Sequence, residues 1–324
     1  MTTKFTYRLG VASIAIVALS SLLALACLQA CSESHEGTLH EDQTLEHDGK
    51  TRTYHLYEPA KHDEPRPLVL VLHGGFGTID ATIGVGLSRW PHQVWLDIAD
   101  EENLYVAVPQ GLNEHWNDCR PSCERCGDED DKGFLLALLG ALDEAHDIDT
   151  SRTFVVGESN GGHMAQRLAL EVPEHFAGIG VVISLIPQGH TCTESGQSVP
   201  VMYQVGTADA VVLYEGGQAG DDESLNHISA QDTVAYWADV NQCDAVPATH
   251  DLPDLDPEDS STVTRDDYTC ASGDALSMLN LVGAGHVPPS IEVQVTALWE
   301  SVAGIQNHDV EGARAFWEFF QGTP

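Results

Sequence analysis

The sequence has 324 residues and a formal net charge of −36, with 14 Lys and Arg against 50 Asp and Glu. A surface this acidic repels the phosphates of nucleic acids and of anionic lipids, so nucleic acid is excluded as a partner. We interpret the acidic excess as a source of solubility or of tolerance to salt. The chain is long enough for one large domain with a substantial core.

Residues 1–30 have the composition of a secretory signal. Lys4 and Arg8 form a basic start, and an apolar stretch without Asp or Glu follows from Val11 to Leu28. This order of charge and hydrophobicity is typical of a signal peptide that is removed from the mature protein. A transmembrane anchor is the alternative, although the apolar stretch is barely long enough to span a bilayer.

The end of this segment, "LQAC", predicts a lipid anchor. A leucine three residues before Cys31, with an alanine directly before it, resembles the lipobox of bacterial lipoproteins. We therefore predict that Cys31 is lipidated and that the protein is exported, as a periplasmic or cell-surface lipoprotein or otherwise as a secreted protein. Cleavage near Cys27, or by an ordinary signal peptidase, is the alternative. Contact with a membrane is expected only through this N-terminal lipid.

Six of the eight cysteines follow this segment, and an even number favours disulfides in an exported protein. They are Cys119, Cys123, Cys126, Cys192, Cys243 and Cys270. Cys243 and Cys270 flank an acidic, proline-rich insertion and are expected to close it as one pair, while Cys192 joins the cluster at 119–126. A zinc site built from His115 and the three clustered cysteines is the alternative. Disulfides fit an oxidising compartment better, so we predict no metal.

Residues 31–48 are polar, acidic and rich in histidine, and we expect them to form a flexible tether before a domain at 49–324. Residues 51–59 alternate in the manner of an edge strand. Continuous apolar runs then predict strands buried on both faces of a sheet, at 66–75, 104–111, 152–159, 177–186, 200–209 and 276–286. The predicted helices cover residues 94–103, 132–146, 163–172 and 309–320.

This alternation predicts an α/β fold with a mostly parallel central sheet and helices on both faces. Ligands bind such sheets beyond the carboxyl ends of the strands. The segment His73-Gly74-Gly75 and the residues Ser159, Asp209 and His286 each follow a predicted strand. We therefore expect these four segments to meet at one edge of the sheet.

The pentapeptide 157–161, Gly-Glu-Ser-Asn-Gly, is typical of a nucleophile elbow. The chain must turn sharply from strand to helix at Ser159, and the glycines on either side avoid clashes in that turn. A serine hydroxyl is a poor nucleophile and needs a base within hydrogen-bond reach. A tight glycine turn without chemistry is the alternative.

His286 is the predicted base among 16 histidines, because it ends an apolar strand among small neighbours. Asp209, in "VGTADA", also follows a strand and would orient the imidazole of His286. Ser159, Asp209 and His286 are therefore the predicted catalytic residues. The competing residues are His190 and His227 for the base, and Asp221, Asp222 and Asp232 for the acid.

Two backbone N–H groups are expected to form an oxyanion hole. One belongs to Asn160, directly after the nucleophile. The other lies in "HGGFG", at Gly75 or Phe76, where the glycines let a carbonyl oxygen approach. His73 is interpreted as a structural support of this loop, with contact to the substrate as the alternative.

Seven segments of the chain resemble the poly(3-hydroxybutyrate) depolymerase and feruloyl esterase-like group of α/β-hydrolases, which includes secreted LpqC-type esterases. They are "LVLVLHGGFG", "VPQGLNEHWN", "DDKGF", "VVGESNGGHMAQRLA", "VGTAD", "GAGHVPP" and "WEFF", in the order and rough spacing of that group. The resemblance covers roughly residues 48–322 and implies the α/β-hydrolase fold. It also implies Ser159, Asp209 and His286 as nucleophile, acid and base of a carboxylic ester hydrolase that needs no cofactor.

Two departures from that group concern the substrate. The sequence Val-Pro-Pro at 287–289 follows the predicted base where the group often has Thr-Trp-Pro, so an aromatic wall of the pocket is expected to be absent. Glu158 is uncommon beside the nucleophile, and we expect it to contact the substrate and to disfavour anions. Trp116, in the cysteine-rich loop, is a second candidate for lining the pocket, with a place in the core as the alternative.

The acidic run 128–131 is interpreted as a solvated helix start with Asp131 as its N-cap. A calcium site is the alternative, although the spacing matches no EF-hand loop.

The sequence therefore predicts an exported serine esterase that acts through an acyl-enzyme. The expected substrates are hydroxyalkanoate oligomers, feruloyl or acetyl esters of polysaccharides, or short acyl esters, including esters derived from polymers. A serine peptidase on the same fold, and a non-catalytic surface binding protein on a hydrolase scaffold, are the alternatives. Such peptidases usually carry a large extra domain, and such binding proteins commonly lose the serine or the histidine.

Overall fold

The computed structural model describes residues 35–61, 65–86, 88–121, 123–271, 273 and 275–323. The chain divides into two compact units, Met1–Glu36 and Gly37–Pro324, and every helix and strand below belongs to the second unit. The predicted signal peptide and the predicted lipidation site at Cys31 lie outside the described residues. Within those residues, no helix has both the length and the apolar character needed to cross a bilayer.

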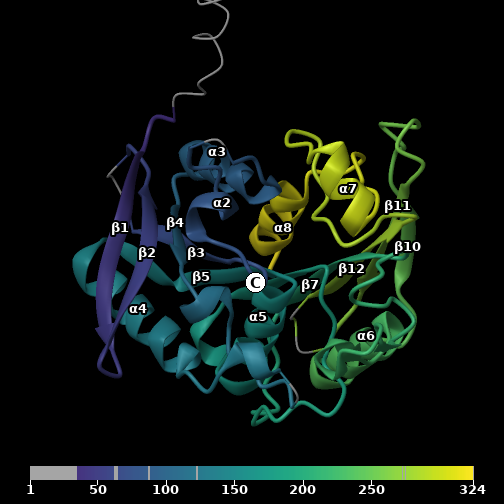
Figure 1. Ribbon diagram of the computed structural model, residues 1–324, viewed down its shortest axis with the longest axis horizontal. Helices are drawn as coiled ribbons and strands as arrows, with labels where there is room; N and C mark the ends of the chain where they lie inside the picture. The colour runs from purple at the N-terminus through teal and green to yellow at the C-terminus, as the bar shows by residue number, and fades with distance from the viewer. Residues whose placement is uncertain are drawn as a thin grey trace, which may run out of the picture. The chain divides into compact units, whose positions relative to one another are not determined.

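A large sheet forms the centre of this unit, with ten strands among the described residues (Figure 1). They are β1 (Thr38–His47), β2 (Lys50–Glu58), β3 (Arg66–Leu72), β4 (Tyr105–Pro109), β5 (Ile148–Glu158), β6 (Gly178–Val182), β7 (Val201–Gly206), β10 (Ala248–Asp251), β11 (Thr262–Tyr268) and β12 (Leu276–Val282). A short separate ladder joins β8 (Gly217–Gln218) to β9 (Asn226–His227).

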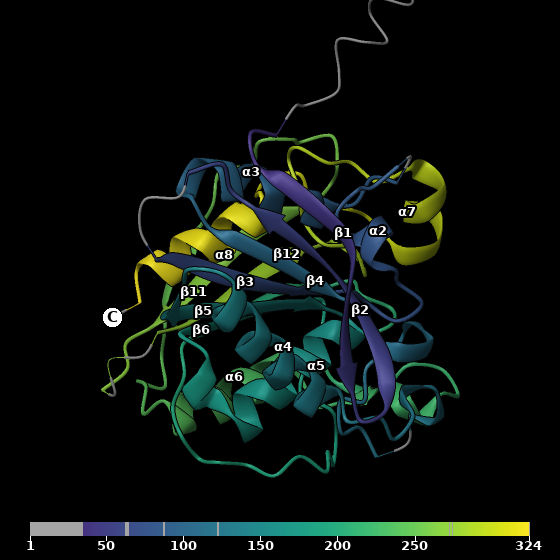
Figure 2. The ribbon, with the colours of Figure 1, turned by 90° about the vertical axis from the view of Figure 1, so that its left-hand side faces the viewer.

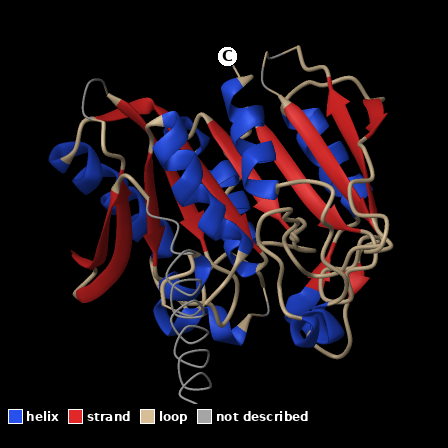
Figure 3. Ribbon diagram, turned by 90° about the horizontal axis from the view of Figure 1, so that it is seen from above, coloured by secondary structure: helices blue, strands red, loops and turns tan. Residues whose placement is uncertain are grey.

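The order of the strands across the large sheet is β1-β2-β4-β3-β5-β6-β7-β12-β11-β10. The strands from β4 to β12 in this order run parallel, and antiparallel strands extend the sheet at both edges. Seen from above, the strands lie side by side across the molecule (Figure 3). The predicted α/β fold with a mostly parallel sheet is therefore confirmed.

Helices cover both faces of the sheet (Figure 2). They are α2 (Ile79–Thr82), α3 (Val94–Glu102), α4 (Asp131–Ala145), α5 (Asn160–Glu171), α6 (Ala230–Val240), α7 (Ala297–Ala303) and α8 (Gly312–Gln321). Apolar side chains of α4, α5 and α6 pack on one face, and those of α3 and α8 pack on the other. Because both faces are covered, every residue of β3, β4, β6 and β7 is buried, which explains why their sequences are apolar except for Arg66 in β3 and Gln204 in β7.

The predicted tether is wrong for Thr38–His47, which form the edge strand β1. This strand pairs antiparallel with β2 through a turn at Asp48 and Gly49, whose φ angles are 49° and 71°. Asp-Gly is a favoured sequence for such a hairpin, because both turn positions need a positive φ. The side chains of β1 are mostly exposed, so a polar composition fits an edge strand as well as it fits a tether. The compact unit accordingly begins at Gly37, before the predicted boundary at residue 49.

The six cysteines of the described residues form three disulfides, Cys119–Cys192, Cys123–Cys126 and Cys243–Cys270. The predicted pairing of Cys243 with Cys270 is confirmed, and Cys192 joins the loop cluster as expected. The insertion that Cys243 and Cys270 enclose forms the hairpin of β10 and β11. Because all six sulfur atoms are in disulfides, the zinc alternative has no thiolate to use.

Candidate active site

Ser159 lies between the last residue of β5 and the first residue of α5. Its backbone angles, φ 50° and ψ −117°, fall in a strained region that residues with a side chain rarely adopt. A Cβ atom on Gly157 would overlap the carbonyl group of Gly161, and one on Gly161 would overlap the carbonyl group of Leu72. Glycine is therefore required at both positions for the chain to turn this sharply.

Two hydrogen bonds join Ser159, His286 and Asp209 in one line. The Nε2 atom of His286 lies 3.0 Å from Ser159 Oγ, and its Nδ1 atom lies 2.7 Å from Asp209 Oδ2. The second carboxylate oxygen, Asp209 Oδ1, accepts from the N–H groups of Val211 and Val212 at 2.7 and 2.8 Å. With Nδ1–H donating to the carboxylate, Nε2 is the nitrogen that can accept the serine proton.

The competing residues from the sequence take part in other interactions. The Nε2 atom of His227 lies 2.9 Å from His163 Nε2, and His190 lies 3.5 Å from Glu194. Asp222 accepts from the N–H and hydroxyl groups of Ser224, Asp232 accepts from the hydroxyl of Ser229, and Asp221 is exposed. None of these contacts joins them to Ser159.

Of the two alternatives for the second oxyanion donor, the structure rules out Phe76. Its N–H donates to the carbonyl oxygen of Glu114 at 2.9 Å, so the prediction of Phe76 is wrong. A Cβ atom on Gly75 would lie 3.8 Å from Asn160 Cβ, which places these two residues side by side next to Ser159. Gly75 and Asn160 therefore remain as the candidate donors.

His73 supports the glycine-rich loop, in line with its structural interpretation from the sequence. Its Nε2 atom accepts from the Gly111 N–H at 2.9 Å, and its Nδ1 atom donates to the Gly74 carbonyl at 2.7 Å. Burial lowers the pKa of His73 to about 4, so the ring is neutral near pH 7. A neutral ring held through both nitrogens orients the loop and has no free atom for proton transfer.

Trp116 does not line a pocket, and the prediction that it contacts the substrate is wrong. Its side chain is fully buried, and its ring packs 5.0 Å from the His73 ring. The indole N–H donates to the His73 carbonyl at 3.0 Å, because a buried indole needs an acceptor. Trp116 is a core residue that supports the glycine-rich loop.

Glu158 binds the protein itself, which corrects the prediction of a substrate contact. Its Oε2 atom accepts from the Trp90 indole N–H at 2.6 Å and lies 3.2 Å from His92 Nε2. Its Oε1 atom accepts from the Gly74 N–H at 3.3 Å. Burial acts to raise the pKa of Glu158, but His92 and Trp90 outweigh it, so the pKa is lowered and the carboxylate stays ionised. Glu158 therefore ties the glycine-rich loop to the elbow.

Comparison with known proteins agrees with this geometry, although no family model matches the chain. A putative esterase, NocK, from Nocardia uniformis subsp. tsuyamanensis is 29% identical over 257 residues, which cover 74% of this chain and 72% of that protein. A poly(3-hydroxybutyrate) depolymerase from Ralstonia pickettii is 29% identical over 172 residues, which cover 45% of this chain and 34% of that protein. The solved structure of an acetyl xylan esterase from Aspergillus awamori has a TM-score of 0.55 and 16% identity, and the match covers 89% of this chain and 100% of that one.

This chain is an esterase of the α/β-hydrolase type. The strand order and the strained serine at the end of β5 are the features of that fold on which its chemistry depends.

In this esterase, the acidic run 128–131 has a structural role. Glu129 pairs with Lys50, Asp130 accepts from the Gly133 N–H as the N-cap of α4, and Asp131 pairs with Arg52. The N-cap is thus Asp130, one residue before the predicted Asp131. These contacts use the carboxylates that the calcium alternative would need.

A second acidic cluster of the esterase lies where the loop before β11 meets the segment before α8. Asp256, Asp259 and His308 bring potential ligand atoms within 4.8 Å of one another, and all three side chains are partly exposed. His308 Nδ1 already lies 3.2 Å from Asp256 Oδ2. A carboxylate–histidine contact of this kind is stable without an ion, and we assign no metal to it.

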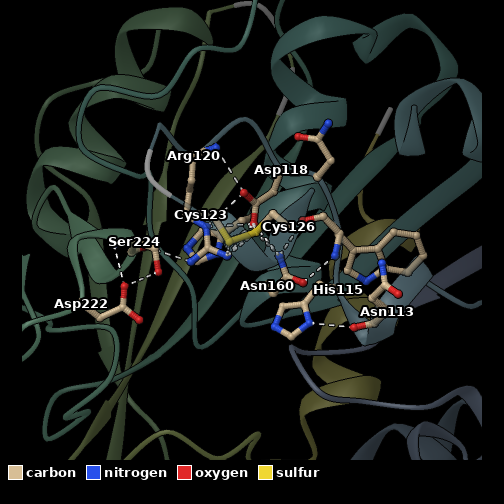
Figure 4. The surroundings of a disulfide bond; sticks show 12 residues. Asn113, His115, Asp118, Arg120, Cys123, Cys126, Asn160, Asp222 and Ser224 are labelled. Atoms are coloured by element: carbon tan, nitrogen blue, oxygen red, sulfur yellow. Dashed lines mark hydrogen bonds and ion pairs between the residues drawn. A yellow bond between two sulfur atoms is a disulfide. The ribbon is translucent and has the colours of Figure 1, made fainter. Parts of the chain in front are cut away.

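Two residues that the sequence did not single out lie beside Asn160, the residue after Ser159. Asp118 Oδ2 accepts from Asn160 Nδ2 at 2.5 Å, and Arg120 Nη2 lies 2.9 Å from the same oxygen (Figure 4). In the sequence they belong to "HWNDCR", next to one of the family-like segments, where a charged pair in a loop carries no pattern of its own.

Proposed function

We propose that this esterase is an exported serine hydrolase that cleaves carboxylic esters with Ser159 as nucleophile, His286 as base and Asp209 as the acid that orients His286. The observation that carries the proposal is the line of hydrogen bonds from Ser159 Oγ through His286 to Asp209. The strained backbone of Ser159 supports it, since strain of this kind recurs at active sites.

In the first half-reaction, His286 Nε2 takes the proton of Ser159 Oγ while Oγ attacks the ester carbonyl carbon. The carbonyl oxygen becomes an oxyanion, which the N–H groups of Asn160 and Gly75 stabilise. The positive charge on His286 is balanced by Asp209, whose other oxygen is held by two backbone N–H groups. His286 then donates its proton to the leaving oxygen, and the alcohol departs.

In the second half-reaction, water takes the place of the alcohol. His286 accepts a proton from the water, whose oxygen attacks the acyl-enzyme carbonyl, and the same two N–H groups stabilise the second oxyanion. Transfer of the proton from His286 back to Ser159 Oγ releases the carboxylic acid. The residues of the chain account for every proton in the cycle.

The substrates we propose are esters with an uncharged acyl group: short acyl esters, hydroxyalkanoate oligomers, or feruloyl and acetyl esters of polysaccharides. The formal net charge of −36 supports the restriction to uncharged groups, because a surface this acidic repels anions. The depolymerase among the relatives supports hydroxyalkanoate oligomers by its name, over the third of its length that aligns.

Export with a lipid on Cys31 is part of the proposal. Support comes from the basic and apolar sequence of residues 1–30 and from the disulfides, which persist in oxidising compartments. In cells fed a labelled fatty acid, the label should enter the wild-type protein and be absent from Cys31→Ser. Equal labelling of both proteins would exclude this lipidation site.

The experiment that tests the catalytic proposal compares the full chain with its Ser159→Ala variant. The substrates are p-nitrophenyl acetate, butyrate and octanoate, together with methyl ferulate. Saturable hydrolysis should fall by about 10³-fold or more in Ser159→Ala, because the nucleophile is lost. Ser277→Ala serves as a control, since Ser277 is a buried serine of β12 that bonds to Asp267.

Two outcomes would contradict the proposal. Equal trace rates in wild type and Ser159→Ala would favour the non-catalytic binding protein. Faster cleavage of a p-nitroanilide than of the p-nitrophenyl ester with the same acyl group would favour the peptidase.

A further inference from the structure

The side chain of Asn160, the residue after the nucleophile, is bonded at both ends. Its Oδ1 atom accepts from the Trp116 N–H at 2.8 Å, and its Nδ2 atom donates to the Trp116 carbonyl at 3.1 Å and to Asp118 Oδ2 at 2.5 Å. Asn160 is 4% exposed, so water does not compete for these bonds. Asparagine is the side chain of this length that offers one acceptor and two donors, and it uses all three here.

The carboxylate of Asp118 carries a full charge into this buried place. Its side chain is 0% exposed, and the guanidinium of Arg120, 6% exposed, approaches both oxygens, with Nε 3.0 Å from each of them. The bond from Asn160 Nδ2 is therefore charge-assisted, which makes it shorter and stronger than a neutral one. Figure 4 shows Asp118 between Arg120 and Asn160.

Arg120 is itself held in place. Its Nη1 atom donates to the Ser224 carbonyl at 3.0 Å, and its Nη2 atom lies 3.2 and 3.5 Å from the sulfur atoms of Cys126 and Cys123. The disulfide between these cysteines thus packs against the guanidinium (Figure 4). A side chain restrained at each nitrogen gives Asp118 one defined position.

The other titratable neighbour of Asp118 does not balance its charge. His163 Nδ1 lies 3.7 Å from Asp118 Oδ2, but burial and the nearby Arg120 and His227 lower the pKa of His163 well below its usual value. His163 is therefore neutral, and Arg120 is the counter-charge of Asp118.

A buried ion pair of this kind is a poor way to gain stability, because the loss of hydration offsets most of the attraction. Its advantage is that it fixes positions. The bidentate contact with the guanidinium holds the carboxylate in one orientation, and the carboxylate in turn holds the amide group that donates to it. The amide belongs to the residue whose backbone N–H we assign to the oxyanion hole.

We propose that Asp118 and Arg120 are positioning residues, which hold the Asn160 N–H in place for the oxyanion through the Asn160 side chain. The inference rests on the proposed function, because it concerns the same reaction. Neither residue touches the substrate or Ser159 in this scheme. Oxyanion donors act only over a narrow range of positions, and a displacement of about 1 Å can cost about 10²-fold in rate.

The test measures kcat, KM and thermal stability of the full chain and its Asp118→Asn and Arg120→Met variants. Rates are expressed per active site, titrated with a fluorophosphonate, so that misfolded protein is not counted. We expect kcat to fall by about 10–100-fold in both variants while KM stays within about threefold, because the lost interaction acts on the transition state. Arg120→Lys keeps the charge without the bidentate geometry and should recover part of kcat.

A second readout separates positioning from folding. Ser159 converts a trifluoromethyl ketone into a tetrahedral oxyanion, and the inhibition constant of this compound should rise about in proportion to the loss in kcat. The pH at which kcat/KM falls on the acidic side should not move, since His286 and Asp209 are untouched. A merely structural role would lower the melting temperature and leave both readings unchanged.

The matched control is Arg52→Met, which also removes an arginine from a buried aspartate, Asp131, whose other oxygen accepts from the Asn117 backbone N–H and not from Asn160. Its melting temperature should fall to a similar extent, with kcat within about twofold of wild type. Wild-type kcat and inhibition in Asp118→Asn, with Ser159→Ala inactive, would overturn the positioning role and leave the proposed function intact. An equal loss of kcat in Arg52→Met would also overturn it, and retained activity in Ser159→Ala would overturn both proposals.

Discussion

Two buried arginine–aspartate pairs in this esterase have nearly the same chemistry and different surroundings. The side chains of Arg120 and Asp118 are 6% and 0% exposed, and those of Arg52 and Asp131 are 2% and 1% exposed. In each pair the aspartate also accepts from an asparagine. Asp118 accepts from the Asn160 side chain at 2.5 Å, and Asp131 accepts from the Asn117 backbone N–H at 2.7 Å.

The difference lies in what that asparagine does. Arg52 belongs to β2 and Asp131 begins α4, so their pair ties a strand to a helix and to the cysteine-rich loop. The pair of Arg120 and Asp118 contacts the side chain of Asn160, which follows Ser159, the proposed nucleophile. The burial of an ion pair and the distance between its atoms are therefore not enough to assign its role. The role depends on which further group donates a hydrogen bond to the carboxylate.

The largest expected effect is on kcat and comes from replacing Asn160 by aspartate; the matched variant replaces Asn117 by aspartate. Asn160→Asp replaces both N–H donors by an acceptor facing Asp118 and the Trp116 carbonyl. We expect kcat to fall by about 10²–10³-fold, the scale of a lost oxyanion donor. In the matched variant Asn117→Asp, only the bond from Asn117 Nδ2 to the Glu129 carbonyl is lost.

That second variant should lose about 1–3 kcal/mol of stability in urea unfolding, with kcat per titrated site within about twofold of wild type. Equal losses of kcat in the two variants would remove the distinction between the pairs.

A smaller effect is expected from removing one of two disulfides: Cys123–Cys126, which contacts Arg120, or Cys243–Cys270, in the insertion. Cys243→Ser/Cys270→Ser opens a link across 27 residues and should lower the free energy of unfolding by about 3–4 kcal/mol with no change in kcat. Cys123→Ser/Cys126→Ser opens a link across 3 residues and should lower it by about 1–2 kcal/mol.

The second double variant should nevertheless lower kcat a few-fold, because Arg120 loses its contacts with both sulfur atoms. Guanidinium unfolding and kcat measured on the same samples check both statements. Loss of activity in Cys243→Ser/Cys270→Ser, with normal activity in Cys123→Ser/Cys126→Ser, would contradict the positioning role of Arg120.

The smallest expected effect is the pH dependence of stability that is caused by Asp131, the partner of Arg52. Burial raises the pKa of Asp131, although the Asn117 N–H and Arg52 act to lower it. The folded protein therefore binds the proton of Asp131 more tightly than the unfolded chain does. The contribution of Asp131 to the free energy of unfolding is full below the pKa in the unfolded chain, about 4, and is lost as the pH rises through the raised pKa in the folded protein. From about pH 3 to about pH 6, wild type should lose stability relative to Asp131→Asn, by about 1.4 kcal/mol per unit of pKa difference. Urea unfolding across that range gives the sign, and a relative gain would refute the direction.

The fold was predictable from the sequence where both faces of the sheet are covered. The largely apolar runs matched β3, β4, the second half of β5, β6, β7 and β12, and the helix predicted at 132–146 is observed at Asp131–Ala145. The exception is β1, whose exposed side chains are polar, so its composition is that of a disordered tether. The Asp48-Gly49 turn was the local signal for a hairpin, and the polar composition around it was given more weight.

The candidate catalytic line was predictable for a general reason. Ser159, Asp209 and His286 each follow a strand of a parallel sheet, and the carboxyl ends of such strands meet at one edge whatever the details of packing. Periodicity and strand ends are local properties, and a sequence displays them directly.

Tertiary structure alone decided how the neighbouring residues act. Trp116, Glu158 and Phe76 were plausible in or around the pocket, yet each is bonded to a segment far along the chain or buried in the core. Asp118 carried no pattern at all and became notable only through Asn160, which is 42 residues away. A buried polar group takes whichever partner packing brings within reach, and no local pattern encodes that choice.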